Sequence, residues 1–370
     1  MGVLPRISIS WKRVPGYPAG WMLTNLRLHD FRPFPGLEFH PVPGANFLVG
    51  PNAQGKTSIL EAACLLLRLQ SPRTNTLGEC VRFGHPGFSV DGHWAGRHLH
   101  VKYVGRLRHF VLDSKPQSLA ADYLAVAKVV WISNADLDLV RGGGALRRRF
   151  LDFLGVQLVS GYLHQLRTYE RALRSRNALL REGRPRREIA AFDPPLCAAG
   201  DFLLEARAGL VEGLGPTARD AYRSISGTGE TLDVTYKAGA GTPMIEQLAA
   251  APANEERLRT TTVGPHRDDM VLLLDEKPAA SFASEGQQRS IALALKLAQA
   301  REIASGTGHE PLYLIDDVFG ELDPARRNNL LTALPKEAQK LVTTTTLAWL
   351  EEAPWPATVF QLRDGCLSSD

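Results

Sequence analysis

Short apolar runs alternate along the chain with stretches that carry apolar residues at helical spacing. Asn46 to Val49 predicts a strand, and Thr57 to Leu69 predicts a helix whose apolar positions fall on one side. Two further four-residue apolar runs, Val129 to Ile132 and Leu312 to Ile315, also predict strands. This alternation of strands and helices at the two ends of the chain predicts an α/β fold.

The middle of the chain predicts helices. Residues 145–183 are helical in pattern, and Gly183-Arg184-Pro185 ends that stretch. A second helical run, 196–225, has leucines at near-heptad spacing, and a strand is predicted at 231–236. We expect the two helical runs to form a short antiparallel hairpin, far below the length of a long coiled coil.

Residues 50–57, G-P-N-A-Q-G-K-T, follow the first predicted strand and fit the pattern G-x-x-x-x-G-K-T. The backbone N–H groups of such a loop cradle nucleotide phosphates. A strand, a glycine loop and a helix start in this order make an anion site, because unpaired N–H groups and the helix dipole both point at the ligand. The predicted nucleotide-binding residues are Gly50, Pro51, Asn52, Ala53, Gln54, Gly55, Lys56, Thr57 and Ser58.

Four side chains supply the predicted chemistry, with ATP and Mg²⁺ as cofactors. Lys56 is expected to neutralise the β- and γ-phosphates, and the Thr57 hydroxyl to ligate Mg²⁺. Asp316 ends a predicted strand and is placed to hold the metal through its water shell. Asp317 is the predicted base that orients and deprotonates the attacking water, which makes Lys56 and Asp317 the catalytic pair. Paired aspartates at a strand end also serve as turn or helix caps.

Residues 284–289, S-E-G-Q-Q-R, open an alanine-rich stretch that predicts a long helix. Ser284 is a natural N-cap, so a pure capping role is one interpretation. The other is a second phosphate-binding helix start. A γ-phosphate held between the loop of one subunit and Ser284, Gly286 and Gln287 of another would explain why one chain has two anion sites. Dimerisation would then depend on ATP.

Charge distribution points to a polyanionic partner, although the net charge is only +4. Residues 141–187 contain twelve arginines, no lysines and three acids. Arginines recur at helical spacing there, and arginine rather than lysine favours phosphate contact over a merely solvated helix face. A predicted hairpin near residue 100 carries further basic residues, with an ordinary polar sheet face as the alternative. The candidate DNA-contacting residues are Lys102, Arg106, Arg108, Arg167, Arg171, Arg174 and Arg181.

Few aromatic residues accompany either basic cluster, which favours backbone contact with duplex DNA over stacking on single strands. At 370 residues the chain is long enough for two domains. It has no apolar run near 18 residues and no signal peptide pattern, so we expect a cytoplasmic protein without membrane contact. The four cysteines lack C-x-x-C spacing and are expected to be reduced thiols.

The order of the phosphate loop, the S-x-G-Q segment and the Asp-Asp strand resembles the ABC-type ATPase heads of chromosome-maintenance and DNA-repair proteins. Further segments are similar to the RecF family of bacterial recombination mediators. The resemblance covers the chain from about Met22 to its end. The segments that carry it are 26–32 (L-R-L-H-D-F-R), 52–57 (N-A-Q-G-K-T), 147–152 (R-R-R-F-L-D), 264–269 (G-P-H-R-D-D) and 315–323 (I-D-D-V-F-G-E-L-D).

The resemblance implies a slow, DNA-stimulated ATPase whose ATP-bound homodimer clamps DNA near junctions of single and double strands. With RecR and RecO, such a protein promotes RecA loading on gaps coated by single-strand-binding protein, in DNA repair, replication restart and the SOS response. By position, Asp323 belongs to the loop that crosses the dimer interface, and Ser284 and Gly286 reach the partner's nucleotide. Arg32 is expected near the nucleotide base or phosphates.

The motifs predict the domain layout, because the phosphate loop and Asp316-Asp317 must meet around one nucleotide and so join the two ends of the chain. We expect an ABC-type P-loop ATPase head of mixed sheets with flanking helices at residues 22–140 and 262–370. An inserted, mainly helical lobe occupies residues 141–261, and residues 1–21 form an N-terminal extension. For the segment 264–269, a structural loop network and a phosphate-linked switch are both open interpretations.

Three departures from related heads bear on the mechanism. Ser133-Asn134 follows the predicted strand at 129–132, where a phosphate-sensing glutamine is usual. Thr343 to Thr346 stand where a histidine is usual, and a threonine hydroxyl can bond phosphate but carries no charge. Asp317 replaces a glutamate, and its shorter reach suits slow hydrolysis and a switch.

Two other functional classes are less favoured. A nucleotide-binding subunit of a membrane transporter would use the same chemistry, but usually carries the missing histidine. A nuclease or helicase would need metal-ligand clusters or strand-separating motifs, and the ten histidines are scattered.

Overall fold

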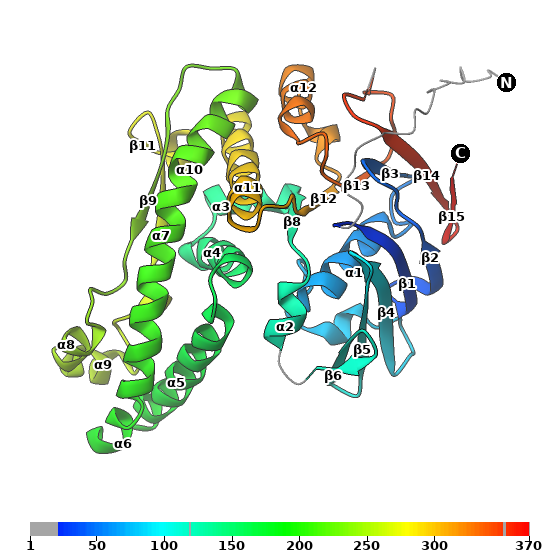
Figure 1. Cartoon of the computed structure of the whole chain (residues 1–370). Coiled ribbons are helices and arrows are strands. Elements are labelled where there is room, and N and C mark those ends of the chain that lie inside the picture. Colours follow the sequence, from blue (N-terminus) through cyan, green and yellow to red (C-terminus); the bar gives the residue numbers. More distant parts are fainter. Residues whose placement is uncertain (1–20, 118–119, 351–352, 370) are drawn as a thin grey trace. The chain divides into compact units, whose positions relative to one another are not determined.

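The computed structural model describes residues 21–117, 120–350 and 353–369, and the chain forms two compact units (Figure 1). The first unit contains the described residues up to Ser133 and those from Glu310 onward, and the second runs from Asn134 to His309. The extension expected at residues 1–21 lies outside the described residues except for Trp21.

An antiparallel sheet in the first unit has six strands in the order β2-β1-β4-β5-β6-β7. Alternation along β1 buries Leu26, Leu28 and Phe31 and leaves Arg27 and His29 on the outer face, as expected for a sheet with one solvated side. The predicted basic hairpin is present as β5 and β6. The strands are β1 (Leu23–Phe31), β2 (Phe34–Phe39), β4 (Gly87–Trp94), β5 (Arg97–Val104), β6 (Leu107–Leu112) and β7 (Lys115–Pro116).

A second six-stranded sheet in the same unit has the order β15-β14-β3-β13-β12-β8 and is parallel except for β15. Every residue of β3 and β13 is buried, which is why these strands are short runs without alternation. The strands are β3 (Ala45–Val49), β8 (Val129–Ser133), β12 (Leu312–Asp316), β13 (Lys340–Thr344), β14 (Ala357–Arg363) and β15 (Cys366–Ser369).

Helix α1 (Lys56–Arg68) contacts strands of both sheets and lies between them in the first unit (Figure 1). Every residue of α1 except Thr57 is buried, so the helix is covered on all sides rather than along one stripe. The other short helical elements of this unit are η1 (Leu77–Cys80), α2 (Ala120–Ala125), η4 (Phe319–Glu321) and α12 (Pro324–Ala333).

The second unit is mainly helical and is organised around the 34-residue helix α7 (Asp193–Ser226). This helix packs against α5 (Tyr162–Glu182), α11 (Glu285–Thr307) and β9 (Leu232–Lys237). The antiparallel sheet β11-β10-β9 is completed by β10 (Asp269–Leu274) and β11 (Lys277–Pro278). The remaining elements are η2 (Asn134–Leu137), α3 (Asp138–Arg141), α4 (Gly144–Leu158), α6 (Arg186–Ala190), α8 (Met244–Ala249), α9 (Pro252–Leu258), η3 (Pro265–Arg267) and α10 (Ala279–Phe282).

Most predicted elements are present, with one correction in the middle of the chain. Residues 145–183 are two helices, α4 and α5, because Gly161 adopts a left-handed conformation with φ 76° and interrupts the helical backbone. Helices α5 and α7 pack against each other and correspond to the expected hairpin.

The compact units also differ from the expected domain boundaries. Residues 262–309, expected in the ATPase head, include α11 and β10, which pack against α7 and β9 within the second unit. The division of the chain into head and inserted lobe therefore stays a prediction. Among the described residues, every helix is either too short or too polar to cross a bilayer.

Candidate nucleotide-binding site

The phosphate loop lies between β3 and α1, and its glycines are required by close neighbours. A side chain at Gly50 would collide with the carbonyl oxygen of Leu362 on the adjacent strand β14. Gly55 has φ 97°, and a Cβ atom there would lie 2.6 Å from the ring of Phe34. Gln54 fixes the outer side of the loop, since its Oε1 accepts a hydrogen bond from the backbone N–H of Asp364 at 2.9 Å.

The parallel sheet brings the predicted catalytic segments together through its register. Leu48 on β3 pairs with Thr343 on β13, Thr343 pairs with Asp316 on β12, and Asp316 pairs with Ser133 on β8. The carboxyl ends of these four strands therefore lie side by side, next to the loop that follows β3. In open α/β sheets this edge is where ligands bind.

Asp316 is the centre of the polar contacts at this edge. Its Oδ1 accepts hydrogen bonds from the Thr57 hydroxyl at 2.7 Å and from the Thr343 hydroxyl at 2.8 Å. The Thr343 hydroxyl in turn accepts the backbone N–H of Asp317 at 3.0 Å. The structure thus unites Thr57 and Asp316 as predicted. It also brings Thr343 into the site. In the sequence this residue was noted only because a histidine is usual at its position in related heads.

Lys56 and Asp317 influence each other's ionisation. The Lys56 ammonium donates to the carbonyl oxygens of Gly50 at 2.6 Å and Pro51 at 2.8 Å, which holds it over the loop. Burial lowers the pKa of Lys56, and the carboxylates of Asp317 and Asp316 act in the opposite direction. Burial and the neighbouring charge of Asp316 raise the pKa of Asp317. A raised carboxyl pKa is a property of general bases, because such a group accepts protons more readily.

The donor set fits Mg²⁺. Thr57 and Asp316 present a hydroxyl and a carboxylate oxygen within hydrogen-bond distance of each other, and hard oxygen ligands suit this ion. Within the described part of the chain, no group of three or more His, Cys, Asp or Glu is arranged to hold a metal. One carboxylate, a hydroxyl and substrate phosphates are the usual ligands of Mg²⁺ at nucleotide sites, so an all-protein cage is unnecessary.

A buried carboxylate, Glu61 on α1, ties the phosphate-loop helix to two loops. Both carboxylate oxygens accept from the Arg32 guanidinium, at 2.9 and 2.7 Å, and Ser71 and Arg73 donate at 2.6 and 3.0 Å. Burial raises the pKa of Glu61, but the hydrogen bonds from Arg32 and Ser71 and the charges of Arg32 and Arg73 outweigh it and leave the pKa lowered. The carboxylate is therefore ionised and paired.

Arg32 also donates to the carbonyl oxygen of Glu79 at 2.7 Å, so its guanidinium is held by α1 and the 71–80 loop. The expected approach of Arg32 to the nucleotide stays a prediction. The hydrogen bonds of Arg32 show a structural role next to the phosphate loop. Arg32 immediately precedes Pro33 and Phe34, and a Cβ on Gly55 would meet both of them at close range. The Arg32–Glu61 pair thus fixes the wall against which the loop glycine packs.

Residues 284–289, hereafter the signature segment, begin α11 with a complete capping box. The Ser284 hydroxyl accepts the backbone N–H of Gln287 at 3.3 Å, and the Gln287 side chain accepts the backbone N–H of Ser284 at 2.6 Å. Gln287 also donates to Glu230, and Gln288 accepts from Arg141 at 2.5 Å. The capping interpretation is therefore correct as structure, and contact with a partner's nucleotide stays a prediction. Asp323 likewise caps α12, accepting the backbone N–H of Arg326 at 2.9 Å.

The segment 264–269 belongs to a buried network in the second unit. Asp268 accepts from Arg207 at 2.9 Å and from the backbone N–H of Gly239 at 2.7 Å, and Asp269 accepts two bonds from Arg147. Burial lowers the pKa of His266 to about 4, so its ring is neutral near pH 7. These contacts support the structural interpretation of this segment.

The candidate DNA-contacting residues lie in both units. Arg167, Arg171, Arg174 and Arg181 are all exposed on α5. Lys102 and Arg106 are exposed on the β5–β6 hairpin, while Arg108 donates to the carbonyl oxygen of Leu69 at 2.6 Å and is partly buried. Six of the seven candidate side chains are therefore exposed, and their contact with DNA stays a prediction.

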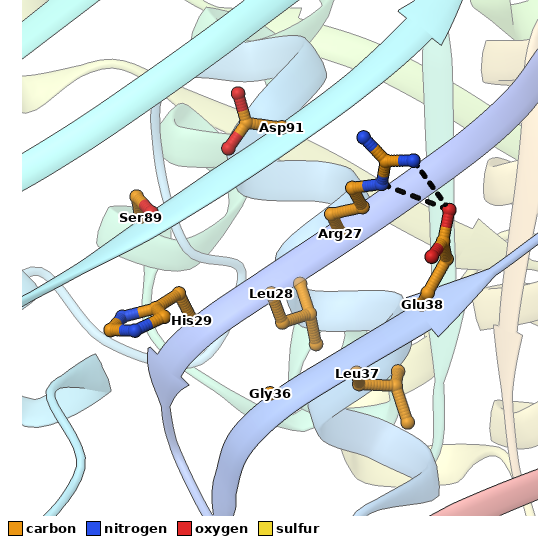
Figure 2. Close-up of a pocket in the computed structure, with 8 residues that line it drawn as sticks. All are labelled: Arg27, Leu28, His29, Gly36, Leu37, Glu38, Ser89 and Asp91. Carbon is orange, nitrogen blue, oxygen red and sulfur yellow. Dashed lines mark hydrogen bonds and ion pairs between the residues drawn. The ribbon is translucent and has the colours of Figure 1, made fainter.

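A shallow pocket on the antiparallel sheet is lined by residues of β1, β2 and β4 (Figure 2). Its charged side chains are Arg27, Glu38 and Asp91, and Arg27 is paired with Glu38 at 2.8 Å. Two carboxylates beside one guanidinium give no excess of positive charge. This pocket therefore does not add to the candidate DNA surface.

Comparison with known proteins agrees with this geometry. A family model described as an AAA domain matches residues 25–91. The DNA replication and repair protein RecF of Anaeromyxobacter sp. (strain Fw109-5) is 40% identical over 366 residues, covering 94% of this chain and 98% of that protein. RecF of Thermosynechococcus vestitus (strain NIES-2133 / IAM M-273 / BP-1) is 36% identical over 368 residues, with coverage of 94% and 97%. The chain belongs to the RecF family.

Solved structures confirm the fold class. The recombination mediator protein RecF-ATP in the RecFOR pathway superimposes with a TM-score of 0.87 at 25% identity, covering 97% of this chain and 100% of that one. An Smc head bound to the C-winged helix domain of ScpA matches with a TM-score of 0.55 at 13% identity and shows the fold alone. The predicted ABC-type ATPase head with mixed sheets and flanking helices is therefore confirmed, as is the resemblance to the RecF family.

The hydrogen bonds of Glu61 can be tested for their contribution to protein stability and to ATP binding by the phosphate loop. Glu61→Gln keeps the size of the side chain but leaves the guanidinium groups of Arg32 and Arg73 without their buried counter-charge. We expect the free energy of unfolding in urea to fall by about 3 kcal/mol and the affinity for ATP to fall with it. Glu38→Gln, in the exposed pair with Arg27, is the control and should change neither. Unaltered stability and ATP affinity in Glu61→Gln would show that the Arg32–Glu61 pair does not stabilise the phosphate loop.

Proposed function

We propose that this protein is an ATP-dependent DNA-binding recombination mediator that uses slow ATP hydrolysis as a switch. The observation that carries the proposal is the arrangement of Thr57 and Thr343 around the Asp316 carboxylate, beside a phosphate loop in a RecF-family chain. Such an arrangement suits a triphosphate with its magnesium ion. ATP in a related RecF structure supports the same ligand here.

Within the site, each side chain has one task. The loop N–H groups and Lys56 bind the β- and γ-phosphates, and Thr57 and Asp316 hold Mg²⁺, which supplies charge neutralisation at the transferred phosphate. Asp317 accepts the proton of the attacking water. Thr343 fixes Asp316 and the backbone of Asp317 together, so it positions both carboxylates.

The start of α11 completes the site in a second copy of the chain. Ser284, Gly286 and Gln287 would face the γ-phosphate bound by the partner, and Asp323 would lie in the loop beside it. The first N–H groups of a helix have no intrahelical acceptor and attract anions. ATP would then hold two copies together, and hydrolysis would let them separate.

DNA and recombination proteins are the proposed partners. The exposed arginines of α5 and the basic residues of the β5–β6 hairpin suit contact with a phosphate backbone. We propose that the ATP-bound dimer engages DNA at single-strand to double-strand junctions in the cytoplasm. With RecR and RecO it would promote RecA loading, and duplex DNA would stimulate its weak ATPase.

The dimer is tested by sedimentation velocity with ATP, with ADP and without nucleotide. Wild type should dimerise only with ATP. Ser284→Arg should stay monomeric because a long cationic side chain fills the space of the γ-phosphate contact, while its ATP binding survives. Ser224→Arg, at an exposed serine on α7, is the matched control and should dimerise normally. A wild type that remains monomeric with ATP would remove the basis of the proposal.

The proposed role of Asp317 as the general base is tested by Asp317→Asn. This substitution preserves the size of the side chain and removes the proton acceptor. Steady-state hydrolysis should fall by about 100-fold or more, with ATP binding and ATP-dependent dimerisation retained. Asp113→Asn is the control, at a remote acid. Wild-type rates in Asp317→Asn would assign the base elsewhere.

DNA contact is tested by the salt dependence of duplex binding. Replacing Arg167 and Arg171 with alanine should weaken binding and lower the slope of log affinity against log salt by about 2, since each phosphate contact contributes about 0.9. Arg219→Ala, at a partly exposed arginine of α7 paired with Asp233, serves as the control. An unchanged slope would make the α5 stripe a solvated helix face.

A further inference from the structure

The backbone around the signature segment is held rigidly from the inner side. The Gln288 side-chain amide donates to the carbonyl oxygens of Ala279, Ala280 and Ala283, which ties the short helix α10 to the start of α11. Arg141 donates to the opposite end of the same amide. These hydrogen bonds stabilise the turn from α10 into α11.

A second clamp acts on the neighbouring glutamine. Gln287 donates to Glu230, and Glu230 also accepts the hydroxyls of Tyr222 at 2.7 Å and Thr228 at 2.9 Å. The Gln287 side chain is thus anchored near the end of α7, whereas Glu285 is exposed and forms ion pairs with Arg141 and Arg289. The N–H groups of Glu285 and Gly286 are the first two of the helix and have no intrahelical acceptor.

Phe282 lies two residues before Ser284, and 68% of its surface is exposed. The other large exposed apolar residues described in the second unit are Leu146, Ile245 and Leu258, at 36–47%. Phe282 is the only aromatic among these four. A phenylalanine held in water on a rigid turn gains nothing from intramolecular packing, whereas rigid aromatic side chains are typical anchors of protein interfaces.

We propose that Phe282 is an apolar anchor of the dimer, packing against the phosphate-loop surface of a second copy of this chain. The inference rests on the proposed ATP-dependent dimer. It identifies an apolar contact that would add to the affinity of the dimer, in addition to the contact made through the nucleotide. The loop offers a suitable surface, because the side chains of Pro51 and Ala53 are exposed on it. The phosphate would join the two copies through charge, and the ring would exclude water next to it.

The proposal explains why both features occur within three residues. The helix start supplies N–H groups for an anion but binds one only weakly while water competes for them. A ring that closes over the edge of the site removes that water, and hydrogen bonds to an anion strengthen in a drier environment. Conversely, the ring alone would bury too small an area for a stable dimer. Each feature makes the other effective only when nucleotide is present.

The experiment is sedimentation equilibrium of the full chain with a non-hydrolysable ATP analogue, which separates association from turnover. We expect Phe282→Ala to raise the dimer dissociation constant by about tenfold or more, and Phe282→Leu to lie between that variant and wild type. Leu258→Ala, at an exposed apolar residue of α9, is the matched control and should dimerise as wild type does. ATP affinity below the dimerisation range and the melting temperature should be unchanged in Phe282→Ala.

The experiments distinguish failure of the Phe282 proposal from failure of the proposed ATP-dependent dimer. If Ser284→Arg is monomeric while Phe282→Ala dimerises with the wild-type constant, the dimer stands and Phe282 has no part in it. If wild type itself does not dimerise, the proposed function fails along with the anchor. A loss of duplex binding in Phe282→Ala, with dimerisation intact, would instead assign the ring to DNA and overturn the proposal.

Discussion

The Asp316 carboxylate depends on a constraint that operates far from it, the register of the buried parallel sheet. Thr57 and Thr343 reach Asp316 only because β3, β13 and β12 end level with one another. Side chains alternate between the two faces of a strand, so a slip of one residue in β12 would carry Asp316 to the opposite face. Strands that are buried on both sides resist such a slip, since every alternative register disrupts close packing. The chemistry at the sheet edge is therefore as precise as the apolar core beneath it.

The phosphate loop is supported by a second, polar constraint. Glu61 is buried within the first unit, and a buried carboxylate is costly unless it is paired and hydrogen-bonded. Arg32, Ser71 and Arg73 meet that requirement together, and through Arg32 they fix the residues that pack on Gly55. A loop that must bind phosphate with its backbone cannot be stabilised by filling it with side chains. Its rigidity has to come from neighbours, and Glu61 shows how α1 gathers them.

Local signals in the sequence predicted the loop, its strand and helix, and the pair Asp316-Asp317, because each lies within one short segment. Contacts between distant segments were not predictable in the same way. The sequence identified Thr343 only as one of the threonines at a position where a histidine is usual. No local pattern shows that its hydroxyl donates to Asp316, 27 residues earlier. The same holds for Glu61 with Arg32 and for Arg141 with Gln288. The break at Gly161 was a local signal that was missed, since a glycine inside a helical pattern is often tolerated.

The signature segment shows that a structural role and a ligand role need not compete. The capping box uses the Ser284 hydroxyl and the Gln287 amide to satisfy the third N–H of the helix and the N–H of the cap itself. It leaves the first two N–H groups of α11 directed outward, where an intrahelical acceptor does not exist. The cap is therefore compatible with the proposed anion contact at the helix start. Gln287 and Gln288 also anchor the segment inward, so the proposed anion contact would require no rearrangement of these two side chains.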